Sequence, residues 1–337
     1  MQEQYKALAK NYHQRPAIYN KVFEPLVEFI RQNPAAPRIQ VLVHLEKLRG
    51  EPANNADFRL LSEAIAVYNF LYAGVEEAMS DVSMSHLEEG DESTLTWHSI
   101  DHQRLLVLSD IHFPYHDRDA LMIALKEGKR REVDSILLNG DILDFYQLSK
   151  FTKDFRKKSV RAEIDTFRYF IDQLKQRFPE TTIYFKFGNH EQRLERWIMN
   201  NGQMFDGLFN IENIVQFNDH GIIYLKDNIG VKFGDLNIIH GHEIRTGLGV
   251  INVARTYYLK AQANILLGHW HQNQEYITRD IAGNIKGAWA QGCLCRLDAE
   301  YTFGLNQWNH GFSIVDKISP KGDFKLKLYR IVDGQFM

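Results

Sequence analysis

Five short apolar runs of the 337-residue chain end directly in side chains that commonly bind metal ions. The segments are "LLVLSDIH" with Asp110 and His112, "ILLNGDILD" with Asp141 and Asp144, "FGNHE" with Asn189, His190 and Glu191, "IIHGHE" with His240 and His242, and "ILLGHWH" with His269 and His271. Carboxylates, neutral imidazoles and one amide, without a thiolate, suit Mn²⁺, Fe or Zn²⁺. We therefore predict a metal site built from all five segments.

The number of candidate ligands indicates two ions rather than one. Seven or eight ligands are too many for a single tetrahedral ion, whereas two ions that share a bridging carboxylate would use them all. Such pairs lie ~3.5–4 Å apart and clamp the oxygens of an in-line displacement. The pattern therefore favours a two-metal site that acts on an in-line displacement.

The apolar runs have the composition of buried β-strands, and strand ends of an α/β sheet meet at one rim. In an extended segment, side chains alternate between faces, so His269 and His271 would share one side and Trp270 would point into packing. From Arg104 onward, strand-like and helix-like segments alternate, and after Gly221 strands dominate. We predict an α/β fold in which a second sheet packs on the first.

The regions before Arg104 have a different composition. Residues 1–80 carry helical apolar spacing with nine Lys/Arg and nine Asp/Glu, and residues 81–100 form an acidic stretch. We expect a helical accessory region for packing or homo-oligomerisation, or alternatively a helical DNA-binding module, then an acidic linker. Residues 101–337 would form the catalytic domain.

Composition excludes several classes of protein. The formal charge is −3, so no global basicity indicates nucleic acid, and no apolar run approaches the ~20 residues that span a bilayer. The first residues lack the apolar core of a signal peptide, which favours a cytoplasmic protein without membrane contact. Cys293 and Cys295 are expected to be reduced thiols used in packing.

The order of the motifs "DIH", "GDILD", "GNHE", "HGH" and "GHWH" resembles the calcineurin-like metallophosphoesterase superfamily. The later segments "GAWAQGCLC" and "QWNHGF" look like a poorly characterised bacterial and phage branch of it. The resemblance covers roughly residues 104–317. It implies a two-sheet β-sandwich flanked by helices, and two divalent ions, Mn²⁺ first, with Fe or Zn²⁺ as alternatives. It also implies attack on phosphorus by a hydroxide that the two ions generate.

The resemblance further implies a role for each matching residue. One ion would be held by Asp110, His112 and His271, the other by Asn189, His240 and His269, and Asp141 would bridge them. His190 resembles the family's acid that assists the leaving alkoxide, with Asp144 beside it. The alternative is a structural His190 that is bonded to Asp144 or Glu191. His242 would face the substrate phosphate.

The sequence indicates the substrate less clearly than it indicates the metal site. Phe145 stands where the serine/threonine phosphatases of this superfamily carry a phosphate-gripping arginine, which argues against a dedicated phosphoprotein phosphatase. Arg193 could contact phosphate instead, or be a solvated helix charge. The basic strip 149–161, with Lys150, Lys153 and Arg156, could follow a phosphodiester backbone, or be a solvated loop.

We therefore predict a phosphodiesterase or nuclease with nucleic acid among its candidate substrates. One alternative is a phosphomonoesterase that acts on a small metabolite or a phosphoprotein. The other is a non-catalytic binding module, which would be expected to lack some of the ligands, and none is missing from the sequence.

Overall fold

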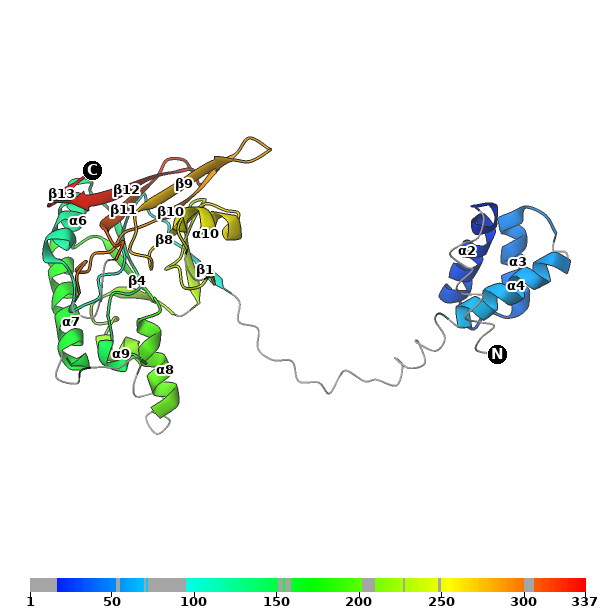
Figure 1. Cartoon of the computed structure of the whole chain (residues 1–337), viewed down its shortest axis with the longest axis horizontal. Coiled ribbons are helices and arrows are strands. Elements are labelled where there is room, and N and C mark those ends of the chain that lie inside the picture. Colours follow the sequence, from blue (N-terminus) through cyan, green and yellow to red (C-terminus); the bar gives the residue numbers. More distant parts are fainter. Residues whose placement is uncertain are drawn as a thin grey trace. The chain divides into compact units, whose positions relative to one another are not determined.

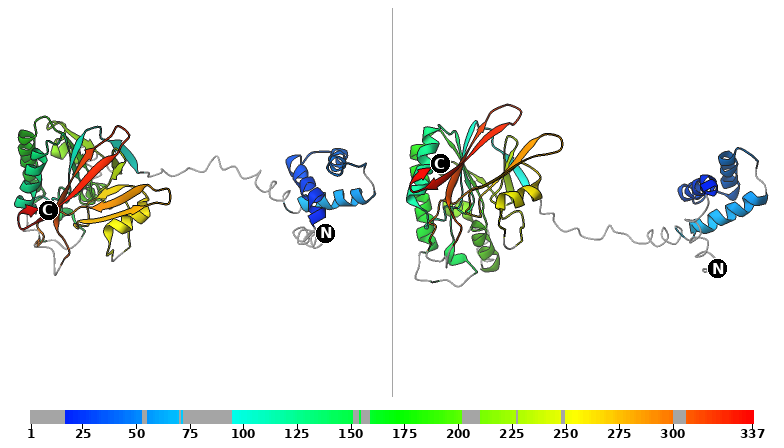
Figure 2. Two further views of the ribbon diagram at one scale, coloured as in Figure 1. Left: turned by 90° about the horizontal axis from the view of Figure 1, so that it is seen from above. Right: turned by 45° about the horizontal axis from the view of Figure 1, so that its top comes forward.

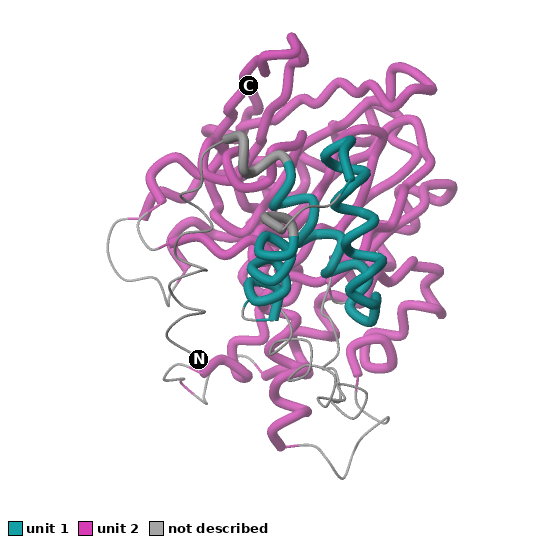
Figure 3. Tube along the Cα trace, turned by 90° about the vertical axis from the view of Figure 1, so that its right-hand side faces the viewer, with its two compact units in different colours: residues 1–91 teal, residues 92–337 magenta. Residues whose placement is uncertain are grey.

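The computed structural model describes residues 17–52, 55–69, 71, 95–150, 154, 159–201, 210–226, 228–247, 250–299 and 306–337. The chain forms two compact units, Met1–Asp91 and Glu92–Met337, which Figure 3 colours separately and which we describe one at a time. None of the helices in these described ranges combines the length and the apolar character that a membrane crossing requires.

The first unit contains the helices α2 (Ala17–Gln32), α3 (Arg38–Arg49) and α4 (Asn55–Tyr68). Their apolar faces share one core, which includes Phe23, Leu26, Leu45 and Val67. Helix α3 ends at Gly50, whose φ of 74° is a left-handed conformation that suits glycine. These helices agree with the helical pattern expected before residue 80.

The second unit contains two β-sheets, which confirms the predicted two-sheet architecture (Figures 1 and 2). The seven-stranded sheet has the order β13-β12-β11-β2-β3-β4-β5 and the six-stranded sheet has the order β1-β6-β7-β8-β10-β9. The first sheet contains β2 (Arg104–Leu108), β3 (Ser135–Asn139), β4 (Thr182–Lys186), β5 (Ile222–Leu225), β11 (His310–Lys317), β12 (Phe324–Val332) and β13 (Gln335–Phe336). The second contains β1 (Thr96–Ser99), β6 (Ile229–Phe233), β7 (Leu236–Ile238), β8 (Ile265–Leu267), β9 (Gln274–Arg279) and β10 (Ile285–Ala290).

Alternation along β2 explains why its sequence is apolar at successive positions. Leu105 and Val107 pack in the core between the two sheets, whereas Leu106 and Leu108 pack against helices on the opposite face. A strand that is buried on both faces has no solvent side, so it reads as a continuous apolar run.

Helices cover the outer faces of both sheets. The helices α6 (Arg118–Arg130) and α7 (Val160–Arg177) pack on the seven-stranded sheet, and α10 (Val253–Ala261) packs on the six-stranded sheet (Figure 1). Shorter elements follow the central strands: the 3₁₀ turn η3 (Tyr146–Leu148), α8 (Glu191–Asn201) and α9 (Ile211–Val215).

The predicted linker of residues 81–100 extends too far toward the second unit. Thr96–Ser99 form β1, which pairs in parallel with β6 from Ile229 to Lys232. The acidic composition of residues 81–95 dominated the sequence pattern and concealed this short edge strand. The remainder of the predicted linker, residues 81–94, lies outside the described residues.

Candidate metal centre

The predicted ligands follow the ends of five strands, three of them neighbours in one sheet and two in the other. β2, β3 and β4 are parallel neighbours in one sheet, and β7 and β8 are parallel neighbours in the other. The segments after these strands bring together Asp110, His112, Asp141, His240, His269 and His271, as the strand-end pattern predicts. Asn189, which follows β4, lines one cleft together with His269. Both sheets therefore contribute to one polar rim.

Asp141 occupies the centre of this cluster. Its Oδ2 lies 3.3 Å from His240 Nε2 and 3.8 Å from His112 Nε2. Asp141 is also common to two groups whose ligand atoms lie within 4.8 Å of one another, one with Asp110 and His112 and one with His240 and His269. Because a carboxylate can offer one oxygen to each neighbour, this geometry fits the bridging role that the resemblance implies.

Two halves of the cluster flank Asp141. We call Asp110, His112 and His271 the His271 half, and Asn189, His240 and His269 the His240 half. In the His271 half, His271 Nε2 lies 3.2 Å from Asp110 Oδ1 and 3.3 Å from His112 Nε2. The assignment of each half to one ion stays a prediction.

Buried atoms without partners test whether the residues fit metal ions. In the His240 half, Asn189 Oδ1 and His269 Nδ1 are buried and make no hydrogen bond to any described residue, and Asp141 Oδ2 lies 3.3 Å from His240 Nε2. Buried polar atoms are nearly always paired, so the two unpaired atoms indicate a missing partner at this site. A divalent cation satisfies an amide oxygen and two imidazole nitrogens together.

The ligands have an unusual backbone conformation. Asp110, His112, Asp141, His269 and His271 all have positive φ, between 51° and 68°. Left-handed residues other than glycine are uncommon and cluster at functional sites. The prediction that "GHWH" is extended is therefore wrong, because β8 ends at Leu267 and the chain turns after it.

The turn still directs the two histidines to different halves. His269 joins His240 and Asp141, whereas His271 contacts Asp110 and His112. Trp270 packs beside α10 as expected, and its indole N–H donates to the Tyr257 hydroxyl at 2.9 Å.

Two glycines in the motifs allow ligands from other segments to approach. A Cβ on Gly188 would lie 2.2 Å from Asp141 Oδ1, and a Cβ on Gly268 would lie 2.5 Å from Asp110 Oδ2. Any side chain at these positions would displace a carboxylate of the cluster. The glycines of "GNHE" and "GHWH" are thus explained by close approach rather than by turn geometry alone.

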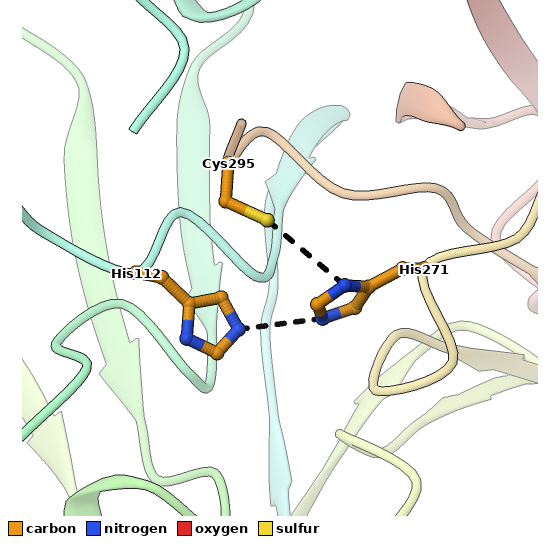
Figure 4. A group of neighbouring side chains, drawn as sticks. All are labelled: His112, His271 and Cys295. Atoms are coloured by element: carbon orange, nitrogen blue, oxygen red, sulfur yellow. Dashed lines mark hydrogen bonds between the residues drawn. The ribbon is translucent and has the colours of Figure 1, made fainter. Parts of the chain in front are cut away.

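In three ligand histidines, Nδ1, the ring nitrogen that points away from the cluster, has a partner within the protein. His112 Nδ1 lies 2.9 Å from Asp144 Oδ1, and His240 Nδ1 lies 2.9 Å from the Asn139 carbonyl oxygen. His271 Nδ1 lies 3.9 Å from Cys295 Sγ (Figure 4). Such contacts fix the ring orientation and leave the Nε2 atoms facing the cluster.

The contact of Cys295 with the site was not predicted from the sequence. Both cysteines were expected to be reduced packing residues, and both are free and buried. Their position after β10 could have been a signal, since Leu294 N donates to the Asp110 carbonyl and so ties this segment to the first motif. The thiol is the less expected partner of a ligand histidine, because sulfur is a weak acceptor.

Glu191 organises the backbone around Asp141. Its carboxylate is fully buried and accepts hydrogen bonds from the backbone N–H groups of Asp141, Ile142, Leu143 and Gly188 at 2.8–2.9 Å. One side chain therefore joins the second and third motifs. Burial raises the pKa of Glu191, and the nearby Asp141 charge acts in the same direction.

Glu243 has the corresponding role in the fourth motif. It accepts from the backbone N–H groups of His240 at 3.1 Å and Gly241 at 2.7 Å, and it pairs with the buried Lys186 at 2.5 Å. Burial opposes ionisation, but the charge of Lys186 lowers the pKa of Glu243 well below its usual range.

Charges within the cluster stabilise one another. Burial disfavours the charged form of Asp110, yet His271 and His240 lower the pKa of Asp110 to about 2. Burial likewise disfavours a charged His240, yet Asp141 and Asp110 raise the pKa of His240 to about 9. By contrast, burial lowers the pKa of His269 to about 4, and the neighbouring His240 charge lowers it further.

His190 and Arg193 form a small network with Asp144. His190 Nδ1 lies 2.9 Å from the Asp144 carbonyl oxygen and 3.2 Å from Oδ1. Arg193 donates to that carbonyl oxygen at 2.9 Å and contacts His190 Nε2 at 2.8 Å. Arg193 therefore contacts His190, and its role toward a substrate stays a prediction. His190 has the contact with Asp144 that is expected if its role is structural.

The other residues that were predicted to contact the substrate lie at separate positions. His242 Nε2 lies 3.0 Å from Gln192 Nε2, and burial lowers the pKa of His242 to about 4. Lys150 lines a cleft of about 700 Å³ that opens beside Asn189 and His269. Lys153 and Arg156 lie outside the described residues.

Comparison with known proteins agrees with the geometry of the site. The family model of the calcineurin-like phosphoesterases matches residues 103–282, and the chain belongs to this family. It is therefore a metal-dependent phosphoester hydrolase whose family uses a dinuclear centre. The predicted family, fold class and enzyme class are confirmed.

Among curated proteins, the chain is similar to the Gene 54 proteins of two mycobacterial phages. Identity is 24% over 248 residues for phage L5 and 27% over 254 residues for phage D29. In both cases the match covers 69% of this chain and 96% of the relative. A solved structure, vacuolar protein sorting 29 of Cryptosporidium parvum, matches 70% of this chain and 95% of its own at 13% identity, with a TM-score of 0.36. That likeness is too low to carry an argument about function.

Proposed function

We propose that the protein is a phosphodiesterase that acts on nucleic acid or a related nucleotide diester. The observation that carries this proposal is the cleft of about 700 Å³ beside Asn189 and His269. Lys150, Arg193 and Arg196 line it, and its described lining contains no aspartate or glutamate. A cationic cleft that extends beyond the ligands suits a substrate with more than one phosphate.

Phe145 supports the same choice. Its ring is completely buried in the core between the seven-stranded sheet and the helices, so it cannot contact a substrate. The phosphate-gripping arginine of phosphoprotein phosphatases therefore has no counterpart at this position. Arg193, bonded to the Asp144 carbonyl oxygen, provides a cation nearby.

The donors of the cluster fit two divalent ions, with Asp141 shared between the two halves. We propose Mn²⁺, with Fe or Zn²⁺ as alternatives, because the donor set combines carboxylates, imidazoles and an amide. When bound, two such ions activate water near neutral pH and neutralise charge on the phosphoryl oxygens.

The protein's own groups would orient the substrate and supply a proton. Lys150 and Arg193 would contact non-bridging phosphate oxygens, and His242 would assist on the other side. His190 donates from Nδ1 to the Asp144 carbonyl oxygen, which leaves Nε2 facing Arg193 and the cluster. Once a phosphate engages Arg193, Nε2 could carry the proton that the leaving alkoxide takes up.

The substrate class can be tested with purified protein and Mn²⁺. Bis-p-nitrophenyl phosphate, p-nitrophenyl phosphate, single-stranded DNA and duplex DNA would be compared in one assay. We expect turnover of the diester and of DNA. Turnover of the monoester alone would replace this proposal with a phosphomonoesterase, and no turnover of any substrate would favour a binding module.

The shared position of Asp141 gives a separate test. Asp141→Ala should reduce activity below detection with every substrate, because both halves lose a ligand. Asp165→Ala, which removes an exposed carboxylate from α7, is the matched control and should retain activity. Full activity of Asp141→Ala would refute the dinuclear assignment.

The role of His190 is tested by leaving groups. His190→Ala should slow alkyl diesters about 10²–10⁴-fold more than activated aryl diesters, since only a poor leaving group needs a proton. An equal loss on both kinds of diester would assign His190 a structural role beside Asp144.

For the first unit we propose an accessory role in homo-oligomerisation, with residues 1–80 as the accessory region and residues 101–337 as the catalytic domain. Ile39 and Phe58 support this proposal because they are 64% and 53% exposed on helices α3 and α4. Light scattering of the full chain and of Ile39→Glu would test it. A wild-type monomer would exclude the proposal.

A further inference from the structure

The first turns of α8 form one wall of the cleft beside the metal ligands. Asn189 precedes the helix, and Arg193, Arg196, Trp197 and Asn200 follow at spacings of three and four residues. Residues at this spacing share one face of a helix. The wall therefore begins at a ligand and continues for about two helical turns away from it.

Two guanidinium groups lie at the end of the wall nearest the cluster. Arg196 donates from Nη2 to the Asn189 carbonyl oxygen at 3.1 Å and from Nε to the Gln192 carbonyl oxygen at 3.1 Å. Arg193 is held by the Asp144 carbonyl oxygen. Both guanidinium groups are thus held by backbone carbonyl oxygens beside the ligands.

Trp197 lies farther along the same wall. Its side chain is 44% exposed, although tryptophan is a residue that folding usually buries. Among the residues that the structure describes, the Trp197 indole stacks on no other ring. An exposed indole that lines a cationic cleft offers a flat apolar surface to whatever the arginines attract.

Cations followed by an exposed aromatic ring are the combination that binds single-stranded nucleic acid, because phosphates contact the cations and a base stacks on the ring. A small phosphorylated metabolite without a base has no use for the indole. A duplex keeps its base faces stacked on each other, so it cannot use the indole without unpairing.

We propose that this face of α8 is a nucleotide subsite for single-stranded nucleic acid. Trp197 stacks on a base next to the scissile phosphate, and Arg196 contacts the adjoining backbone phosphate. The inference rests on the proposed phosphodiesterase function and specifies its substrate class. Neither Trp197 nor Arg196 is a metal ligand in the cluster described above.

The test compares Trp197→Ala and Trp197→Phe with the wild type on oligothymidylate and on bis-p-nitrophenyl phosphate. The ratio of kcat/KM for the oligonucleotide to kcat/KM for the small diester should fall about 10–100-fold in Trp197→Ala, the range expected for one lost base stack. Trp197→Phe should restore most of the ratio, because any aromatic face can stack. Tyr169→Ala removes a side chain on α7 that is 66% exposed and lies outside the cleft, so its ratio should match the wild type.

Arg196→Gln gives an independent readout. The slope of log KM for oligothymidylate against log salt should decrease by about 0.7, as expected for the loss of one phosphate contact to a single strand. An unchanged slope would remove Arg196 from the subsite.

The outcomes separate this inference from the proposed function. If the wild type cleaves both diesters and Trp197→Ala keeps the wild-type ratio, the subsite is wrong and the phosphodiesterase stands. If Trp197→Ala loses duplex and single-stranded turnover equally, the indole does not stack on a free base. If the wild type hydrolyses only monoesters, both proposals fail together.

Discussion

The two halves of the ligand cluster differ in how the protein satisfies them. In the His271 half, Asp110 accepts from the Ser109 hydroxyl at 2.6 Å and lies 3.2 Å from His271. In the His240 half, Asn189 Oδ1 and His269 Nδ1 are buried without hydrogen-bond partners among the described residues. Asp141 stands between them and contacts both.

This difference shows that the protein pairs the polar atoms of the His271 half by itself and leaves two buried atoms of the His240 half without a partner in the described part of the chain. The His271 half has a carboxylate beside two imidazoles, so it is internally compensated. The unpaired atoms of the His240 half carry a desolvation penalty until a cation arrives. Metal removal should therefore affect the His240 half more strongly.

The largest effect is expected from the ion pair that supports the His240 half. Lys186→Met leaves the Glu243 carboxylate buried without its cation, and Glu243 holds the backbone of His240 and Gly241. Breaking a buried pair from one side costs about 3–5 kcal/mol of unfolding free energy. Urea denaturation would measure the loss, with Lys325→Met on the exposed face of β12 as control.

The stability loss in Lys186→Met is also expected to depend on pH. Because the folded pKa of Glu243 lies below its ordinary value, the pair stabilises the protein above the usual glutamate pKa of about 4.3 and loses its contribution as pH falls through the folded value. The difference between wild type and Lys186→Met should thus be largest at neutral pH. A difference that grows toward acid would contradict the ion-pair account.

The next effect compares the halves directly in metal-free protein. Asp110→Ala should lower the unfolding free energy by about 1.5–3 kcal/mol or more, since it removes hydrogen bonds to a charged group. Asn189→Ala should change it by less than about 0.5 kcal/mol, because Asn189 Oδ1 has no partner to lose. Equal losses in both variants would remove the distinction between the halves.

In excess Mn²⁺, Asn189→Ala should lose more stability relative to the wild type than it does in metal-free protein. A ligand that binds only the folded state at 100 times its Kd adds about 2.7 kcal/mol of stability. Asn189→Ala should forfeit much of that gain while its metal-free stability stays unchanged. Thermal denaturation with and without chelator would measure both quantities.

The smallest effect concerns the outer partners within the His271 half. Asp144→Asn weakens the contact to His112 Nδ1 and should reduce Mn²⁺ affinity about 10–100-fold. Cys295→Ala removes a longer contact of 3.9 Å to His271 Nδ1 and should reduce affinity by less than about tenfold. Isothermal titration with Asp165→Asn as control would rank them, and a larger loss in Cys295→Ala would make the thiol the main support of this half.

The sequence predicted the site best where metal-binding residue types directly follow a strand. Asp110, Asp141 and His240 each follow an apolar run, and this pattern predicted their convergence, whereas the strand-rich region after Gly221 predicted the second sheet. Strand composition reflects burial on two faces, a property of local sequence. The convergence followed because parallel neighbours end at a common rim.

Other features depend on contacts between distant segments and have no local signature. The contact of Cys295 with His271 and the four backbone donors of Glu191 arise only after the motifs have assembled. The strand β1 was hidden in an acidic stretch because its pairing with β6 is set by tertiary structure. The turn at His269 departed from an extended pattern since left-handed conformations are stabilised by the surroundings rather than by residue type.

The left-handed backbone of the ligands has a consequence for how the ions enter. Five ligands share this left-handed conformation, and close-packed glycines of other motifs leave the carboxylates of Asp110 and Asp141 little room to move. Loading would then require dehydration of the cation and release of protons, without prior ordering of the chain. Such a rigid cage selects among cations by size and coordination geometry, so a chelated preparation should accept the correct metal quickly and reject ions that need a different arrangement of donors.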